Sequence, residues 1–118
     1  MKKIIILSIL LIALVGCSEK KEDLGSISKV TCEDAYDYVS EDAILVDVRE
    51  KDEYDLDHLE KAINISYTEI EKIDKYADKD TKIIVYCKSG KRSNIAANKL
   101  LELGYKHIYD LGSIESCS

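Results

Sequence analysis

The sequence predicts an α/β domain with a central parallel sheet of about five strands and helices on both faces. Short runs rich in β-branched residues alternate with segments of helical periodicity, which is typical of strands joined by crossover helices. In these runs, the side chains on both faces of the strand are apolar, as expected when helices cover both faces of the sheet. In such sheets, ligands bind beyond the carboxyl ends of the strands.

The elements follow one another from residue 29 onward. Thr31 is the candidate N-cap of a first helix, in which Ala35, Tyr38 and Val39 share a face, and Gly104 ends the last helix. Helices are predicted at 32–40, 50–59, 68–76 and 94–103. Strands are predicted at 43–48, 62–66, 82–87 and 107–111, of which 82–87 is the clearest.

The chain has 118 residues, of which 46% are hydrophobic and 34% charged, and this fits one domain. Its net charge is −6, with 17 Lys and Arg against 23 Asp and Glu. An acidic chain argues against nucleic acid as a partner, because phosphate backbones are bound by basic stripes. We expect a monomer.

The N-terminus has the pattern of an export signal. Two lysines precede an apolar run, Ile4 to Val15, which is shorter than the roughly 20 residues of a membrane-spanning helix. The following "LVGC" resembles the lipobox of bacterial lipoproteins, in which the cysteine is acylated after cleavage; an uncleaved anchor is the alternative. We expect a signal peptide over 1–17, a lipid on Cys17 that anchors the protein to the bacterial membrane outside the cytoplasm, a flexible tether over 18–28 and a folded domain over 29–118.

The stretch "YCKSGKRS", residues 86–93, presents Cys87 between a strand and a helix. The N–H groups of the loop and the positive end of the helix face the sulfur, and Gly90 permits the sharp curl that this requires. The basic side chains that follow favour the reactive thiolate and attract an anion. The alternative is a cysteine that only fills the core, and the order of strand, Cys, Gly, Arg, Ser and helix argues against it.

This loop resembles the active-site loop of the rhodanese family, whose single-domain bacterial members carry C-x-x-G-x-R-S. Residues 44–65 are similar to the family's D-x-R-x-x-x-E-(Y/F) strand and helix and to the segment after them. The matching residues are Asp47, Arg49, Glu53, Tyr54, His58, Ala62, Asn64 and Ile65. Residues 107–114 resemble the last strand and its glycine turn, so the resemblance implies a rhodanese-like domain over nearly all of 29–118.

The resemblance implies a sulfurtransferase in which Cys87 is the catalytic nucleophile. Its thiolate takes the outer sulfur of a small anion such as thiosulfate, holds it as a persulfide and passes it to a thiol or to cyanide. Arg92 is expected as a loop clamp or substrate contact. The residues expected to bind substrate are Lys88, Ser89, Gly90, Lys91, Arg92 and Ser93.

Asp47 and Arg49 are expected to support the site from the end of the neighbouring strand, although such charge pairs are more often structural. His58 is expected to fix its own loop. No cofactor is expected. No metal site is expected either, since the cysteines show no C-x-x-C pairing and the two histidines are far apart.

Two other functions stay open. Phosphatases and arsenate reductases of related fold have five residues between cysteine and arginine, whereas this loop has four, and the tighter ring suits a single sulfur better than phosphate. A non-catalytic or partner-dependent persulfide carrier or sensor on the cell surface would keep the same loop, so only turnover separates it from an enzyme.

With Cys17 acylated, three thiols face an oxidising exterior, and their odd number leaves at least one free. In a rhodanese-like sheet the first and last strands are neighbours, which brings Cys32 and Cys117 close. We hypothesise that they form a disulfide and that Cys87 stays free; two unpaired structural thiols are the alternative. A disulfide requires Cα atoms within roughly 7 Å of each other.

Overall fold

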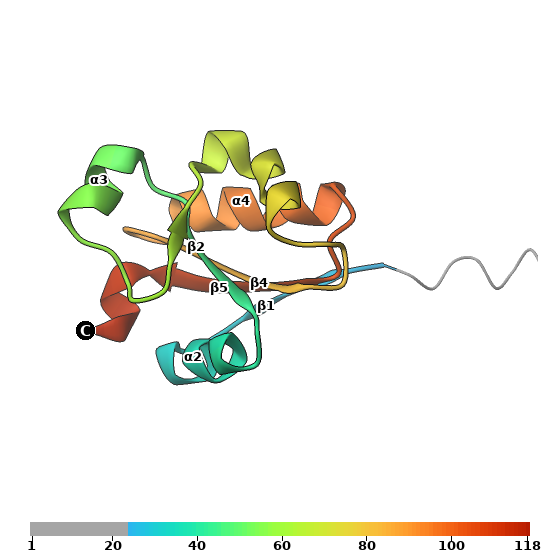
Figure 1. Ribbon diagram of the computed structural model, residues 1–118, viewed down its shortest axis with the longest axis horizontal. Helices are drawn as coiled ribbons and strands as arrows, with labels where there is room; N and C mark the ends of the chain where they lie inside the picture. The colour runs from blue at the N-terminus through green and yellow to red at the C-terminus, as the bar shows by residue number, and fades with distance from the viewer. Residues whose placement is uncertain (1–23) are drawn as a thin grey trace, which may run out of the picture.

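A computed structural model describes residues 24–118, in which five parallel strands form one sheet in the order β1-β5-β4-β2-β3 (Figure 1). The predicted fold class is confirmed. The predicted signal peptide, the lipid site at Cys17 and the tether up to residue 23 lie outside the described residues. None of the helices within residues 24–118 has the length and apolar character to cross a membrane.

The strands and helices alternate along the chain as the sequence predicted. The strands are β1 (Ser26–Lys29), β2 (Ile44–Asp47), β3 (Ile63–Asn64), β4 (Lys82–Cys87) and β5 (His107–Ser113). The α-helices are α2 (Cys32–Ser40), α3 (Lys51–Leu56) and α4 (Lys91–Glu102), and the 3₁₀ helices are η2 (Tyr67–Lys75) and η3 (Ile114–Cys117). Thr31 caps α2 as expected, because its hydroxyl accepts the N–H of Asp34 at 3.1 Å.

Several elements differ from the prediction: α3 covers only Lys51–Leu56 of the predicted 50–59, α4 begins at Lys91 rather than Asn94, and β5 continues to Ser113. Residues 26–28, predicted as part of the tether, belong to β1, in which Ile27 pairs with Ile108 of β5. An edge strand with a single large apolar residue gives too weak a pattern to be predicted. The strand predicted at 62–66 is only two residues long, Ile63–Asn64, and forms the edge of the sheet opposite β1. The helix predicted at 68–76 is the 3₁₀ helix η2, which has a non-helical break at Glu69.

The sheet is covered on both faces, and β4 supplies side chains to each. Ile83, Val85 and Cys87 belong to the core under α4 and η2, whereas Ile84 and Tyr86 belong to the core on the face of α2 (Figure 1). Successive side chains of a strand point to opposite faces. Cys87 is therefore directed toward the face on which α4 begins.

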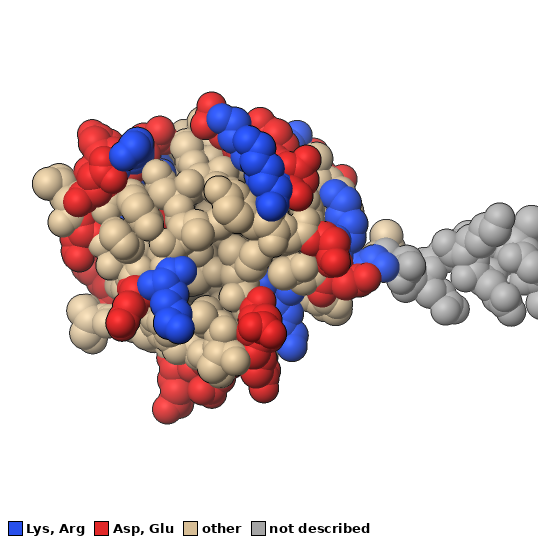
Figure 2. Space-filling model, in the orientation of Figure 1, with Lys and Arg blue, Asp and Glu red and all other residues tan. Residues whose placement is uncertain are grey.

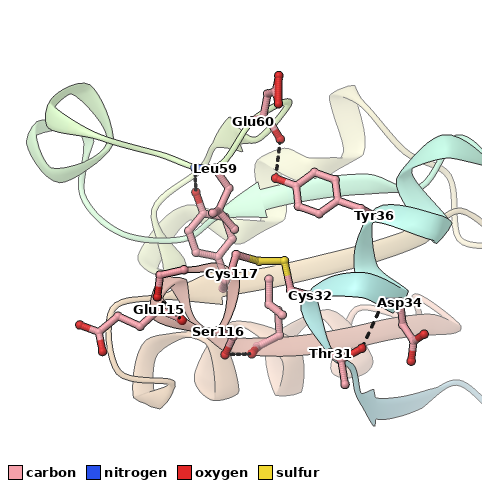
Figure 3. The surroundings of a disulfide bond; sticks show 12 residues. Thr31, Cys32, Asp34, Tyr36, Leu59, Glu60, Glu115, Ser116 and Cys117 are labelled. Carbon is pink, nitrogen blue, oxygen red and sulfur yellow. Dashed lines mark hydrogen bonds between the residues drawn. A yellow bond between two sulfur atoms is a disulfide. The ribbon is translucent and has the colours of Figure 1, made fainter.

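A disulfide joins Cys32, at the start of α2, to Cys117, at the end of η3 (Figure 3). The two Cα atoms lie 5.2 Å apart, which confirms the hypothesised pair, and among the described residues Cys87 is left as the free cysteine. The bridge spans 85 residues. By restricting the unfolded chain, a loop of that length contributes about 4–5 kcal/mol in the chain-entropy model. It ties the C-terminal segment to the α2 side of the sheet.

Candidate active site

Cys87 is the last residue of β4, at the carboxyl edge of the sheet between β2 and β5. Its side chain is fully buried. The sulfur accepts two backbone hydrogen bonds, from the N–H of Gly90 at 3.0 Å and from the N–H of Ser93 at 3.3 Å. Donors in this position stabilise negative charge on the sulfur, so the surroundings suit a thiolate nucleophile.

Gly90 shapes the loop that supplies these donors. It is the N-cap of α4 and has φ +99°, a conformation that side chains rarely adopt. The hydroxyl of Ser93 donates to the carbonyl of Gly90 at 3.1 Å and fixes the first turn. The chain therefore curls around Cys87 and directs the positive end of a helix of 12 residues toward it.

Arg92 is held by α3. Its guanidinium makes a bidentate ion pair with the carboxylate of Glu53, at 2.7 and 3.1 Å. The hydrogen bond from Arg92 is the main reason that the pKa of Glu53 falls from 4.5 to about 2. Arg92 was expected to be either a loop clamp or a substrate contact, and its ion pair with Glu53 is a contact of the first kind. The sequence predicts no role for Glu53, although its place in the D-x-R-x-x-x-E motif is the signal that marks it.

Lys88, Ser89 and Lys91 lie at the outer surface of the loop and are exposed. Their position beside a buried sulfur is compatible with the expected attraction of an anion. Figure 2 shows that lysine and arginine side chains are scattered among acidic ones over the face of the protein that it presents.

Asp47 and Arg49 form a buried ion pair at the end of β2. Arg49 Nη2 lies 2.7 Å from Asp47 Oδ2, and Nε lies 2.9 Å from Oδ1. The hydroxyl of Tyr86 also donates to Asp47, at 2.8 Å, and burial raises the pKa of that hydroxyl, which keeps it a donor. Arg49 donates further to the carbonyl of Asp57 at 2.7 Å. These contacts fix the loop after α3, and among the described residues none of them reaches Cys87.

His58 lies in the loop that Arg49 supports. Its Nδ1 is 3.0 Å from the carbonyl oxygen of Tyr54, and its ring stacks on the Tyr54 ring with the centroids 3.9 Å apart. Both contacts are local, as expected for a residue that fixes its loop. In the described part of the chain, no three His, Cys, Asp or Glu side chains are arranged to bind a metal ion.

The Glu53–Arg92 pair is expected to affect both the reactivity of the Cys87 thiol and the stability of the fold. Replacing Glu53 by Gln is expected to lower the rate at which the Cys87 thiol reacts roughly two- to fivefold, since an ion pair of about 1 kcal/mol or less no longer holds the loop. Because the pKa of Glu53 is lowered in the folded state, the pair stabilises the fold above pH 4.5, and this stabilisation is lost as the pH falls toward 2.

Urea unfolding of the wild-type protein and of Glu53→Gln, between pH 7 and pH 2.5, measures the stabilisation by this ion pair. Glu53 and Arg92 are partly exposed, with side-chain exposures of 30% and 26%, so we expect a difference in unfolding free energy of about 1 kcal/mol or less at pH 7. That difference should shrink as the pH falls below 4.5. A difference that stays constant to pH 2.5 would show that the carboxylate does not act through its charge.

Comparison with known proteins points to one family. The family described as "Rhodanese-like domain" matches residues 31–116. The thiosulfate sulfurtransferase GlpE of Coxiella burnetii is 34% identical over 70 residues, which cover 59% of this chain and 65% of that protein. A putative sulfur carrier protein of Bacillus subtilis, YrkF, is 30% identical over 98 residues, 81% of this chain and 53% of that protein.

A solved structure described as rhodanese with anions from E. coli is 32% identical to the chain. It superimposes with a TM-score of 0.59 and covers 63% of this chain and 89% of its own. The chain thus spans less than two thirds of the length of both curated relatives, GlpE and YrkF, but most of the length of the E. coli structure.

Proposed function

The chain belongs to the rhodanese family, and we propose that it is a sulfurtransferase that moves a sulfane sulfur from a thiosulfate-like anion to a thiophilic acceptor through a persulfide on Cys87. The observation that carries the proposal is the position of the Cys87 sulfur. The sulfur is a free thiol at the end of β4, and the backbone N–H groups of Gly90 and Ser93, at the beginning of α4, are directed at it. The similar E. coli rhodanese is described with anions, which agrees with an anionic donor.

The proposed mechanism has two half-reactions. In the first, the Cys87 thiolate attacks the outer sulfur of thiosulfate; the new S–S bond forms as the S–S bond of the donor breaks, and sulfite leaves with the electron pair. In the second, a thiolate or cyanide attacks the outer sulfur of the persulfide, and the electron pair of that bond returns to Cys87. The N–H groups of Gly90 and Ser93 stabilise the negative sulfur at the start and at the end.

The proposed site of action is the outer side of a bacterial membrane, with the lipid on Cys17 as the anchor and the domain as a monomer. The Cys32–Cys117 disulfide supports an oxidising location, because such bonds persist outside the cytoplasm. The acceptor there is a small thiol or a cyanide-like nucleophile.

A persulfide carrier is the second candidate. It is favoured by the similarity to YrkF, whose name describes a sulfur carrier. A carrier takes up sulfur on Cys87 but does not turn over with small acceptors. A phosphatase has less support, because only four residues separate Cys87 from Arg92, and this tighter ring suits a single sulfur atom better than phosphate.

Steady-state kinetics test the proposed mechanism. Initial rates of thiocyanate formation are measured while thiosulfate and cyanide are both varied. A covalent intermediate gives parallel lines in a double-reciprocal plot. Lines that intersect would contradict a persulfide mechanism. Sulfur uptake without turnover would contradict the enzyme and support the persulfide carrier.

A further inference from the structure

Ser113, at the end of β5, contacts the Cys87 loop through a side chain that no motif predicted. Its hydroxyl donates to the carbonyl of Lys88 at 2.6 Å, across 25 residues of sequence. The two strands are in register here, because Ser113 pairs with Cys87 in the β4–β5 ladder.

The contact fixes one peptide group of the loop. No peptide bond in the described residues is cis, and in a trans peptide the C=O and the N–H point in opposite directions. Because Ser113 holds the Lys88 carbonyl, the N–H of Ser89 in the same peptide is directed away from Ser113. Ser93 fixes a second peptide of the loop in the same way, since its hydroxyl holds the carbonyl of Gly90.

Ser113 itself is held on both sides. Before it, Gly112 turns with φ +83°, and its N–H donates at 2.9 Å to the buried carboxylate of Asp110. After it, the Ser113 hydroxyl accepts the N–H of Glu115 at 3.0 Å and so caps η3. That helix ends at Cys117, in the disulfide of Figure 3. Hydrogen bonds on both sides therefore fix the position of the Ser113 hydroxyl.

We propose that Ser113 is a positioning residue, which orients the Lys88–Ser89 peptide so that the Ser89 N–H adds to those of Gly90 and Ser93 in binding the negative charge of a small anion beside Cys87. Without the hydroxyl this peptide can rotate and present its carbonyl oxygen, which repels an anion. The inference rests on the proposed function for its biological meaning, since the anion is then the sulfur donor.

Two alkylating reagents of similar size test the proposal without any sulfur transfer. Iodoacetate is an anion and iodoacetamide is neutral, so the ratio of their rates with Cys87 reports how well the loop receives negative charge. The rates are measured on the full-length protein by mass spectrometry of the peptide that carries Cys87. Replacing Ser113 by Ala is expected to lower the ratio roughly three- to tenfold, which corresponds to the loss of one ordinary hydrogen bond.

The matched variants are Ser113→Thr and Ser116→Ala. Threonine keeps the hydroxyl and should restore the ratio. Ser116 lies in the same segment, and its hydroxyl is 3.5 Å from the carbonyl of Leu111, outside the Cys87 loop, so its loss should leave the ratio unchanged.

An unchanged ratio in Ser113→Ala would overturn the proposal. So would a parallel slowing of both reagents, which is the sign of a general structural role, or an equal loss in Ser113→Thr. The proposed function is tested separately, by uptake of sulfur from thiosulfate. If the wild-type protein takes up no sulfur, the ratio of the two alkylation rates can still be measured.

Discussion

Replacing Cys87 by serine is expected to reduce sulfur transfer from thiosulfate to cyanide by roughly four orders of magnitude or more, as with other covalent nucleophiles. A serine hydroxyl is not ionised at neutral pH and cannot hold sulfur as a persulfide. The fold should be kept, because serine is slightly smaller and its oxygen can accept the same N–H groups of Gly90 and Ser93. Thiocyanate formation measures the activity, and thermal unfolding measures the fold.

The matched control replaces Cys32 and Cys117 together by serine. These two cysteines are bridged and do not contribute a free thiol. We expect this variant to lose stability but to retain sulfur transfer at a temperature where it is folded. If Cys87→Ser keeps more than a small fraction of the activity, another group is the nucleophile.

Replacing Asp47 by alanine is expected to lower the free energy of unfolding by about 3–5 kcal/mol, because the charge of Arg49 is then buried without its partner. Asp47 is fully buried and Arg49 is 7% exposed. The hydroxyl of Tyr86 loses its acceptor as well. Urea unfolding at pH 7 measures the change.

Asp55 provides the control for Asp47. It pairs with Lys51 at 2.8 Å, but the two side chains are 53% and 80% exposed. Replacing Asp55 by alanine should therefore change the unfolding free energy by about 1 kcal/mol or less. Equal losses for the two variants would show that the buried pair is no more important for stability than a surface pair. Asp47→Asn, which keeps the shape without the charge, should fall between wild type and Asp47→Ala.

The sequence was sufficient for the central strands of the sheet and for the position of Cys87 at the end of one of them. Apolar runs rich in β-branched residues identified β2 and β4, and the position of Cys87 at the end of β4 placed it at the carboxyl edge. The edge strands were harder, because β1 has only Ile27 as a large apolar residue and β3 is two residues long. Their pairing depends on neighbours that are distant in sequence.

The supporting residues show the same limit. The local spacing of Gly90 and Ser93 around Cys87 was readable, whereas the contacts of Arg92 with Glu53 and of Ser113 with Lys88 join segments 39 and 25 residues apart. Which partner such a side chain selects depends on how α3 and β5 pack beside the loop. The Cys32–Cys117 bridge could be proposed only once the order of the strands was expected.

Intact mass spectrometry of the full-length protein, before and after thiosulfate, tests the central claim most directly. We expect a gain of one sulfur atom, which cyanide removes and which Cys87→Ser does not acquire. No gain, with Cys87 still open to alkylation, or an equal gain in Cys87→Ser, would contradict a sulfurtransferase that works through a persulfide on Cys87.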